Sequence, residues 1–219
     1  MKNKLFSKVL VSTCIVSLLS VPAFAKIDSD QSFSSSVKSE DFVISPSHAK
    51  YLKENPEAKS IISGGFQKYT YENAPEDVKA QYDSDCKLIN RTPRSSDTIL
   101  VPTSTVKSSS SSSLQNNVIF YIFHNRSNGD IDIYGSDGSH YKANTSRDYV
   151  GYNYRTQGSA VYCTQIILNT LNYRLAVDGI FGSNTHNAVT NFQRAYGLQV
   201  DATVGPSTWN AMLRASGLY

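Results

Sequence analysis

The sequence has little of the material from which most catalytic sites are built. Its 219 residues include four histidines, and no glutamate follows Glu76. No two histidines lie within four residues of each other, so neither an H-x-H nor an H-E-x-x-H zinc pattern occurs. A glycosidase would need two facing carboxylates, and no aspartate pair is marked out for that role. We therefore expect no metal, no cofactor and no catalytic residue.

The sequence after residue 25 also lacks an excess of positive or negative charge. Residues 1–25 combine three lysines, an apolar run at 9–21 and an Ala-Phe-Ala end, which is typical of a cleaved signal peptide. A retained anchor is the alternative, although the run is short for a membrane span. The whole chain has 21 basic and 18 acidic residues, and removing the three lysines leaves 18 of each. We expect an exported protein with no nucleic-acid partner and no membrane contact after cleavage.

Cysteine is scarce as well. Cys14 lies inside the leader, so Cys86 and Cys163 are the thiols of the mature chain. A disulfide between them is one alternative in an exported protein, and two free thiols are the other. Neither residue lies in a nucleophile motif, and a catalytic thiolate would need a histidine base beside it.

Apolar residues are sparse in 26–117, where serine runs such as 108–113 dominate. Such composition favours a flexible arm or linker. Two helices are predicted within it, at 45–62 and 74–88, the second with acidic residues in its first turn. They belong to an otherwise extended arm, to a small subdomain or to a propeptide, and the sequence leaves these three alternatives open. The arm is the part through which a protein partner would be recruited.

Residues 118–157 change in character. The run 118–123 is rich in β-formers, 131–134 alternates apolar and polar residues, and Asn128-Gly129 marks a turn. These features predict a small antiparallel sheet. Its tyrosines form either a platform for sugars or one face of the sheet, and its histidines and aspartates either meet across strands or occupy turns. The residues concerned are Tyr134, Tyr141, Tyr149, Tyr152, Tyr154, His124, His140, Asp130, Asp132 and Asp137.

Three short amphipathic helices are predicted at 161–171, 185–195 and 206–213, where apolar residues recur at steps of three and four. Asn172 suits a left-handed helix end, Ser183 is a plausible N-cap, and Pro206 fits a first helical turn. None of the three is long enough to be stable alone, so they must pack together.

The C-terminal stretch also carries a series of motifs in a fixed order. They are Val161, Gln165, Leu168, Asn169, Leu171, Tyr173, then Val177-Asp178-Gly179-Ile180-Phe181-Gly182, Thr185, Ala188-Val189, Phe192-Gln193, Gly197-Leu198, Val200-Asp201, Val204, Pro206 and Thr208-Trp209. Over about 55 residues this series resembles the peptidoglycan-binding domain of bacterial cell-wall proteins. Thr164, Asn172 and Ala202 depart from the family pattern, the last two at positions where glycine is common.

The resemblance implies an orthogonal three-helix bundle that binds peptidoglycan through its stem peptide or its glycan strand. A peptide carboxylate would suit backbone N–H groups at the start of the second helix. The alternative is that the same residues make turns and core packing. The residues of interest are Asp178, Gly179, Phe181, Gly182, Asn184, Thr185 and Trp209.

The sequence as a whole predicts an α+β protein that binds the wall without catalysis and lies in the cell wall or outside the cell. A wall hydrolase, an amidase or a peptidase, with its catalytic segment in 40–157, is the alternative. The predicted divisions are a signal peptide at 1–25, an arm at 26–117, a β-rich segment at 118–157 and a peptidoglycan-binding domain at 158–219.

Overall fold

A four-stranded antiparallel sheet forms one layer of the computed structural model, which describes residues 50–51, 53–54, 59–103 and 117–219. These residues all fall in one of the two units of the chain, Val43–Tyr219. The strands follow the order β1-β5-β6-β7. They are β1 (Lys59–Ile62), β5 (Phe120–Asn125), β6 (Asp130–Gly135) and β7 (His140–Asn144). The predicted antiparallel sheet and the α+β class are thereby confirmed.

A second, three-stranded sheet has the order β3-β2-β4. Its strands are β2 (Phe66–Thr70), β3 (Thr98–Pro102) and β4 (Asn117–Val118), and a 3-10 turn, η1 (Tyr71–Asn73), leads into helix α2 (Glu76–Leu88). The helix predicted at 74–88 is confirmed as α2. The flexible arm is wrong for residues 59–103, and so is the helix predicted to reach residue 62, because Ile61 and Ile62 pair with β5. The signal segment and the serine tract at 108–113 lie outside the described residues.

Three helices end the chain: α3 (Ser159–Thr170), α4 (Ser183–Ala195) and α5 (Pro206–Ala215). Asn172 has the predicted positive φ, +67°, and Pro206 is in the first turn of α5. Ser183 is not the N-cap as predicted; Gly182 takes that position. Among the described residues, no helix combines the length and apolar character needed to cross a membrane. Packing as an orthogonal bundle stays a prediction.

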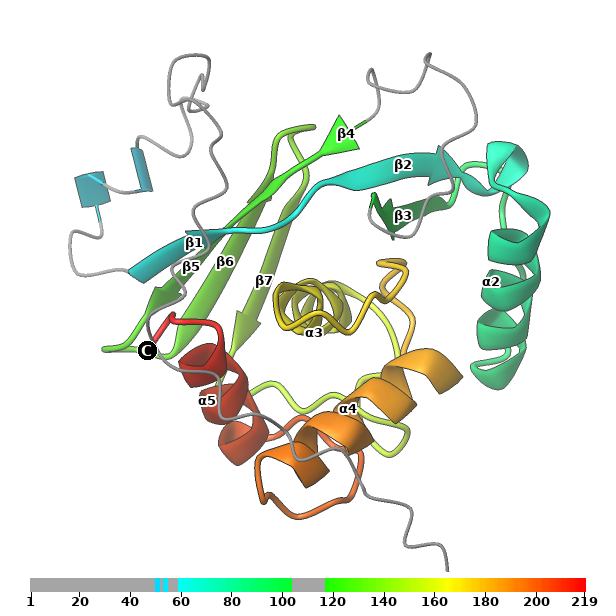
Figure 1. Ribbon diagram of the computed structural model, residues 1–219. Helices are drawn as coiled ribbons and strands as arrows, with labels where there is room; N and C mark the ends of the chain where they lie inside the picture. Colours follow the sequence, from blue (N-terminus) through cyan, green and yellow to red (C-terminus); the bar gives the residue numbers. More distant parts are fainter. Residues whose placement is uncertain (1–49, 52, 55–58, 104–116) are drawn as a thin grey trace, which may run out of the picture. The chain divides into compact units, whose positions relative to one another are not determined.

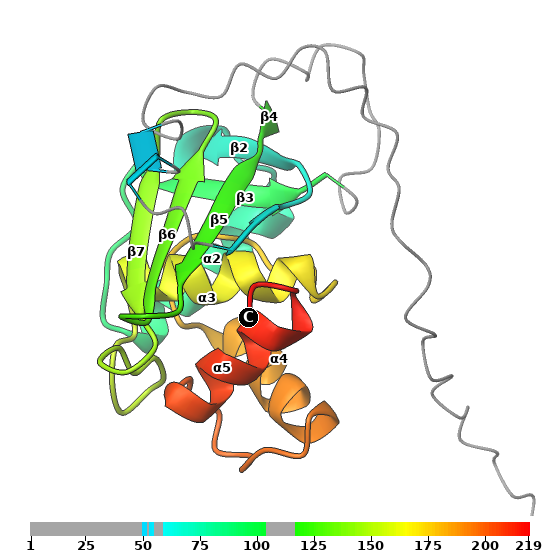
Figure 2. The same cartoon turned by 90° about the vertical axis from the view of Figure 1, so that its left-hand side faces the viewer.

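The core lies where α3 packs against the four-stranded sheet (Figure 1 and Figure 2). Inward residues of the strands, such as Phe120, Ile122 and Ile133, join the buried face of α3 and the aromatic anchors Phe192 and Trp209 in one cluster. A smaller cluster gathers residues of α2 and β3, and Ile180 from the loop before α4 completes it. The N-terminal elements are thus packed onto the C-terminal helices.

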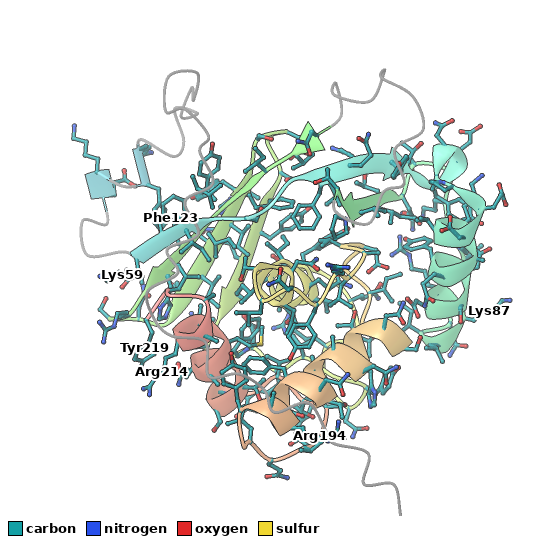
Figure 3. The ribbon with its side chains drawn as sticks, viewed as in Figure 1. Lys59, Lys87, Phe123, Arg194, Arg214 and Tyr219 are labelled. Carbon is teal, nitrogen blue, oxygen red and sulfur yellow. The ribbon has the colours of Figure 1, made fainter. Side chains whose placement is uncertain are left out.

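Three of the helices have a basic side chain in their last turn. Lys87, Arg194 and Arg214 stand in the last turns of α2, α4 and α5, where the helix dipole favours positive charge. Figure 3 shows Lys87 and Arg194 directed outward and Arg214 beside Tyr219. The Arg214 guanidinium lies 4.2 Å from the centre of the Tyr219 ring.

Candidate functional site

The loop between α3 and α4 is organised by the amide of Gln165. Its Oε1 accepts hydrogen bonds from the N–H groups of Asp178 and Gly179, at 3.1 and 2.9 Å. Its Nε2 lies within 3.1 Å of Asp178 Oδ1, the Ile180 carbonyl and Thr185 Oγ1. We call these five residues the first clamp.

The loop between α4 and α5 repeats this arrangement around Gln193. Oε1 of Gln193 accepts from the N–H groups of Asp201 and Ala202, and its Nε2 reaches Asp201 Oδ1, the Thr203 carbonyl and Thr208 Oγ1. These residues form the second clamp. The segments VDGIFGSNT and VDATVGPST, at 177–185 and 200–208, share the pattern. A search for internal repeats would have found the two clamps from the sequence.

A carboxylate from outside the predicted domain occupies the start of α4. Asp85 of α2 accepts a hydrogen bond from the Ser183 N–H at 3.1 Å, and the Gln81 amide lies 3.0 and 3.1 Å from its two oxygens. Gly182 permits this approach, because a Cβ there would stand 2.0 Å from the Asp85 carboxyl carbon. The position expected for a ligand carboxylate therefore holds an internal one. No sequence signal pointed to Asp85.

The other N–H groups of the first loop are also engaged within the protein. Ile180 N donates to Asp178 Oδ1, Phe181 N to the Thr156 carbonyl and Gly182 N to the Ile180 carbonyl. A ligand would have to displace one of these bonds, or the Asp85 contact, in order to use the backbone of this loop.

Most of the predicted site residues are buried, and one is exposed. The Phe181 and Trp209 side chains lie in the core, and Trp209 donates its indole N–H to the Asp148 carbonyl at 2.8 Å. Asn184 is exposed at the start of α4. Ligand contact at these residues stays a prediction, and the geometry favours it best at Asn184. The buried ones are Asp178, Gly179, Phe181, Gly182, Thr185 and Trp209.

Burial changes the electrostatics of the first clamp. It raises the pKa of Asp178 to about 7, against the hydrogen bonds from Gln165 and Ile180 that favour the ionised form. The nearby charge of Asp85 adds to the increase in this pKa. Desolvation makes the carboxylate costly here, so Asp178 binds its proton more tightly than an exposed aspartate does.

Cys86 and Cys163 are free, buried thiols, so the disulfide alternative is not what the structure contains. Burial raises the pKa of both thiols, and Cys163 is affected most strongly. Both residues are therefore protonated near neutral pH, and neither offers the thiolate that a cysteine hydrolase requires.

One histidine–aspartate pair does form across the large sheet. His140 Nε2 lies 2.8 Å from Asp132 Oδ1, and Lys142 Nζ lies 3.3 Å from the same oxygen. His124 is separate from this pair: it is buried, with Nδ1 2.9 Å from the Leu218 carbonyl. Among the residues that the structure describes, no three His, Cys, Asp or Glu side chains are placed to share a metal ion.

The five tyrosines considered above as a platform for sugars separate into three groups. Tyr141 stacks on Tyr162 of α3, and Tyr134 stacks on His140. The other three, Tyr149, Tyr152 and Tyr154, are exposed in the connector between β7 and α3. A single platform of five rings is therefore wrong.

Comparisons with known proteins match two segments of the chain to peptidoglycan-binding families. Residues 157–212 match the family described as "Putative peptidoglycan binding domain". Residues 61–120 match another with the description "Putative peptidoglycan-binding domain". The second match covers β2, α2 and β3. From composition alone, these residues are predicted to lie in a linker.

One solved structure and one enzyme are similar to parts of this chain. The crystal structure of a peptidoglycan-binding protein from Clostridioides difficile, in complex with glutamine hydroxamate, matches with a TM-score of 0.60 and 29% identity over 72% of this chain and 94% of that one. The zinc D-Ala-D-Ala carboxypeptidase of Streptomyces albus G is 54% identical over 37 residues. That match spans 17% of this chain and only 14% of the enzyme.

Proposed function

Because the chain carries domains of the peptidoglycan-binding family, we propose that it is an exported, non-catalytic protein that attaches itself to the bacterial wall. The observation that carries this proposal is the likeness to the C. difficile protein, which covers 94% of that chain. The likeness is therefore not confined to a short module, and the relative that it matches is named for binding.

Charge supports local recognition. The chain without residues 1–25 has 18 basic and 18 acidic side chains, so bulk attraction to an anionic wall is weak. Binding must then come from defined local contacts, and Asn184, exposed beside the first clamp, is one side chain that could make them. A protein partner bound through residues 26–117 would make the chain an adaptor, and this is part of the same proposal.

A wall hydrolase is the second candidate, and one observation favours it. The His140–Asp132 pair lies within 40–157 and has the geometry of an imidazole oriented by a carboxylate. The short likeness to the Streptomyces enzyme points the same way, although it covers a small part of that protein.

The test incubates the purified chain, residues 26–219, with insoluble peptidoglycan sacculi. After sedimentation, the bound protein and the soluble fragments are both measured. We expect sedimentation that soluble peptidoglycan fragments compete away, with no new fragments above a protein-free control. Protein that stays in the supernatant would overturn wall binding.

Released fragments would overturn the non-catalytic claim. The variants His140→Ala and Asp132→Asn then show whether the pair is responsible, because fragment release that survives both changes excludes it. Circular dichroism of each variant checks that the fold is intact.

A further inference from the structure

Exposed aromatic rings are concentrated in the connector between β7 and α3. Tyr149, Tyr152 and Tyr154 have 38%, 46% and 56% of their surface exposed. Elsewhere among the described residues, large exposed apolar side chains are scattered singly along the chain, at Ile62, Leu88, Tyr196, Val200 and Tyr219. Three rings within six residues are therefore a local feature and not the ordinary background of surface tyrosines.

The backbone that carries these rings is held in a defined form. Val150 exchanges two hydrogen bonds with Val204 of the loop before α5, at 3.1 and 2.8 Å. Within the connector, Gly151 N donates to the Arg155 carbonyl and Arg155 N to the Tyr149 carbonyl. An ion pair of 3.0 Å between Arg155 and Asp148 closes the turn. The rings are thus ordered before any ligand arrives, which reduces the entropy lost on binding.

The rings lie beside the N-terminal ends of two helices, α4 and α5. Tyr149 packs against Gly205, which precedes α5, and its ring stacks on that of Tyr154 with centroids 5.2 Å apart. Tyr152 stacks on His186 in the first turn of α4, also at 5.2 Å, and meets the edge of Phe181. The rings therefore extend from the start of one helix to the start of the other.

The chemistry of this surface fits a sugar chain. Asp148 and Arg155 neutralise each other, so the turn offers no net positive charge to a polyanion. Exposed Asn153 lies between Tyr152 and Tyr154, and exposed Arg155 follows Tyr154, so the surface is not the continuous apolar patch of a protein interface. Tyrosine faces receive the C–H faces of sugar rings, while the phenol hydroxyls and Asn153 meet sugar hydroxyls.

We propose that Tyr149, Tyr152 and Tyr154 form a stacking surface for the glycan strand of peptidoglycan. This surface lies outside both matched segments, at 61–120 and 157–212. The proposal rests on the proposed wall-binding function and deepens it, because it assigns recognition to the sugar chain and not to the stem peptide.

The test uses intact sacculi in a sedimentation assay. In solution, it uses glycan strands that an amidase has freed of their stem peptides, together with a soluble oligomer of β-1,4-linked N-acetylglucosamine. The variant Tyr152→Ala/Tyr154→Ala should bind the peptide-free glycan about tenfold more weakly, since each of the two lost rings costs about threefold. Tyr152→Phe/Tyr154→Phe keeps both rings and removes only the hydroxyls, so its affinity should lie closer to that of the wild type than to that of the alanine variant. Tyr196→Ala, at the exposed tyrosine that caps the C-terminal end of α4 outside the connector, is the matched control.

The outcomes separate this proposal from the function on which it depends. If the wild type does not sediment with intact sacculi, the wall-binding function fails. If it binds intact sacculi but not the soluble peptide-free glycan strands, or if the alanine variant binds those strands as well as Tyr196→Ala does, the function stands and the glycan surface is wrong. Chemical shifts of the tyrosine rings on adding the oligomer report the contact directly. Tyr154→Ala alone repeats the test at the most exposed ring, should the double variant fold poorly.

Discussion

The two clamps are built from the same hydrogen bonds but lie in different surroundings. Asp178 is buried in the first, whereas the corresponding Asp201 is exposed in the second. The first clamp is covered by strand β3, since Leu100 and Val177 exchange two backbone hydrogen bonds, and by α2, since Asp85 caps α4. The second is joined to Val150 of the connector. The central amides of Gln165 and Gln193 are both buried, so the two clamps differ chiefly in the burial of their aspartates and in what covers them.

This difference indicates which clamp contributes more to the free energy of unfolding. A buried amide network that loses a member leaves polar groups without water to replace it, while water reaches an exposed network. The first clamp should therefore be more sensitive to change than the second, although a list of their hydrogen bonds does not distinguish them.

The largest contrast is expected in pH dependence. Burial raises the pKa of Asp178 from 3.8 to about 7, so the folded protein holds a proton that the unfolded chain releases above about pH 4. The contribution of this group to the free energy of unfolding is greatest below pH 4 and is lost as the pH rises through 7. The full loss is about 4 kcal/mol. Urea unfolding at several pH values measures it.

Asp178→Asn keeps the acceptor oxygen and removes the titration, so its stability should change less between pH 4 and 7. Asp201→Asn retains Asp178, so its free energy of unfolding should fall with pH as steeply as that of the wild type. Equal slopes for the wild type and Asp178→Asn would refute the assignment.

Removing the central amide should come next. Gln165→Ala leaves the buried N–H groups of Asp178 and Gly179 without their acceptor, so we expect a loss of about 3 kcal/mol in the free energy of unfolding. Gln193→Ala should cost less, about 2 kcal/mol, because water can reach the exposed Asp201 while the buried Ala202 N–H loses its acceptor. Chemical denaturation compares them, and equal losses would break the contrast between the clamps.

A smaller effect is expected at Gly179, which has φ +71° and lies under Tyr162, with a Cβ position 2.2 Å from a carbon of that ring. Gly179→Ala should cost about 2 kcal/mol through strain and overpacking. Gly197→Ala is the control, since Gly197 has φ +64° and open space around its Cβ position. Thermal melts that gave both variants the same loss would show that Tyr162 simply moves aside.

The smallest change should be a gain. Ala202 occupies the position equivalent to Gly179 and has φ +57°, a conformation that costs an L-residue energy. Ala202→Gly should stabilise the protein by about 0.5 kcal/mol, after the entropy lost by the more flexible glycine chain is subtracted. Differential scanning calorimetry can resolve it, with Asn172→Gly as a control, because asparagine tolerates φ +67° better. A lower melting temperature for Ala202→Gly would contradict this account.

Local patterns predicted the C-terminal helices well. Apolar spacing and Pro206 placed α3, α4 and α5 within a few residues of their ends. The sequence did not predict that Asp85 caps α4, because nothing in its own segment distinguishes it from the other aspartates of α2. It also failed for residues 59–103, where short strands such as β2 are stable only through partners far along the chain. Non-local contacts decided what local composition left open.

The Asp85–Ser183 contact has a consequence for the order of folding, since it joins residues 98 positions apart. The clamps close over short loops and need only neighbouring helices. The cap on α4 must wait until most of the chain has collapsed, because closing so long a loop costs entropy before any contact repays it. During synthesis, α2 leaves the ribosome long before its partner exists. Unpaired Asp85 and the apolar face of α2 are therefore exposed until the last helices arrive, and in that interval the chain is most open to misassembly.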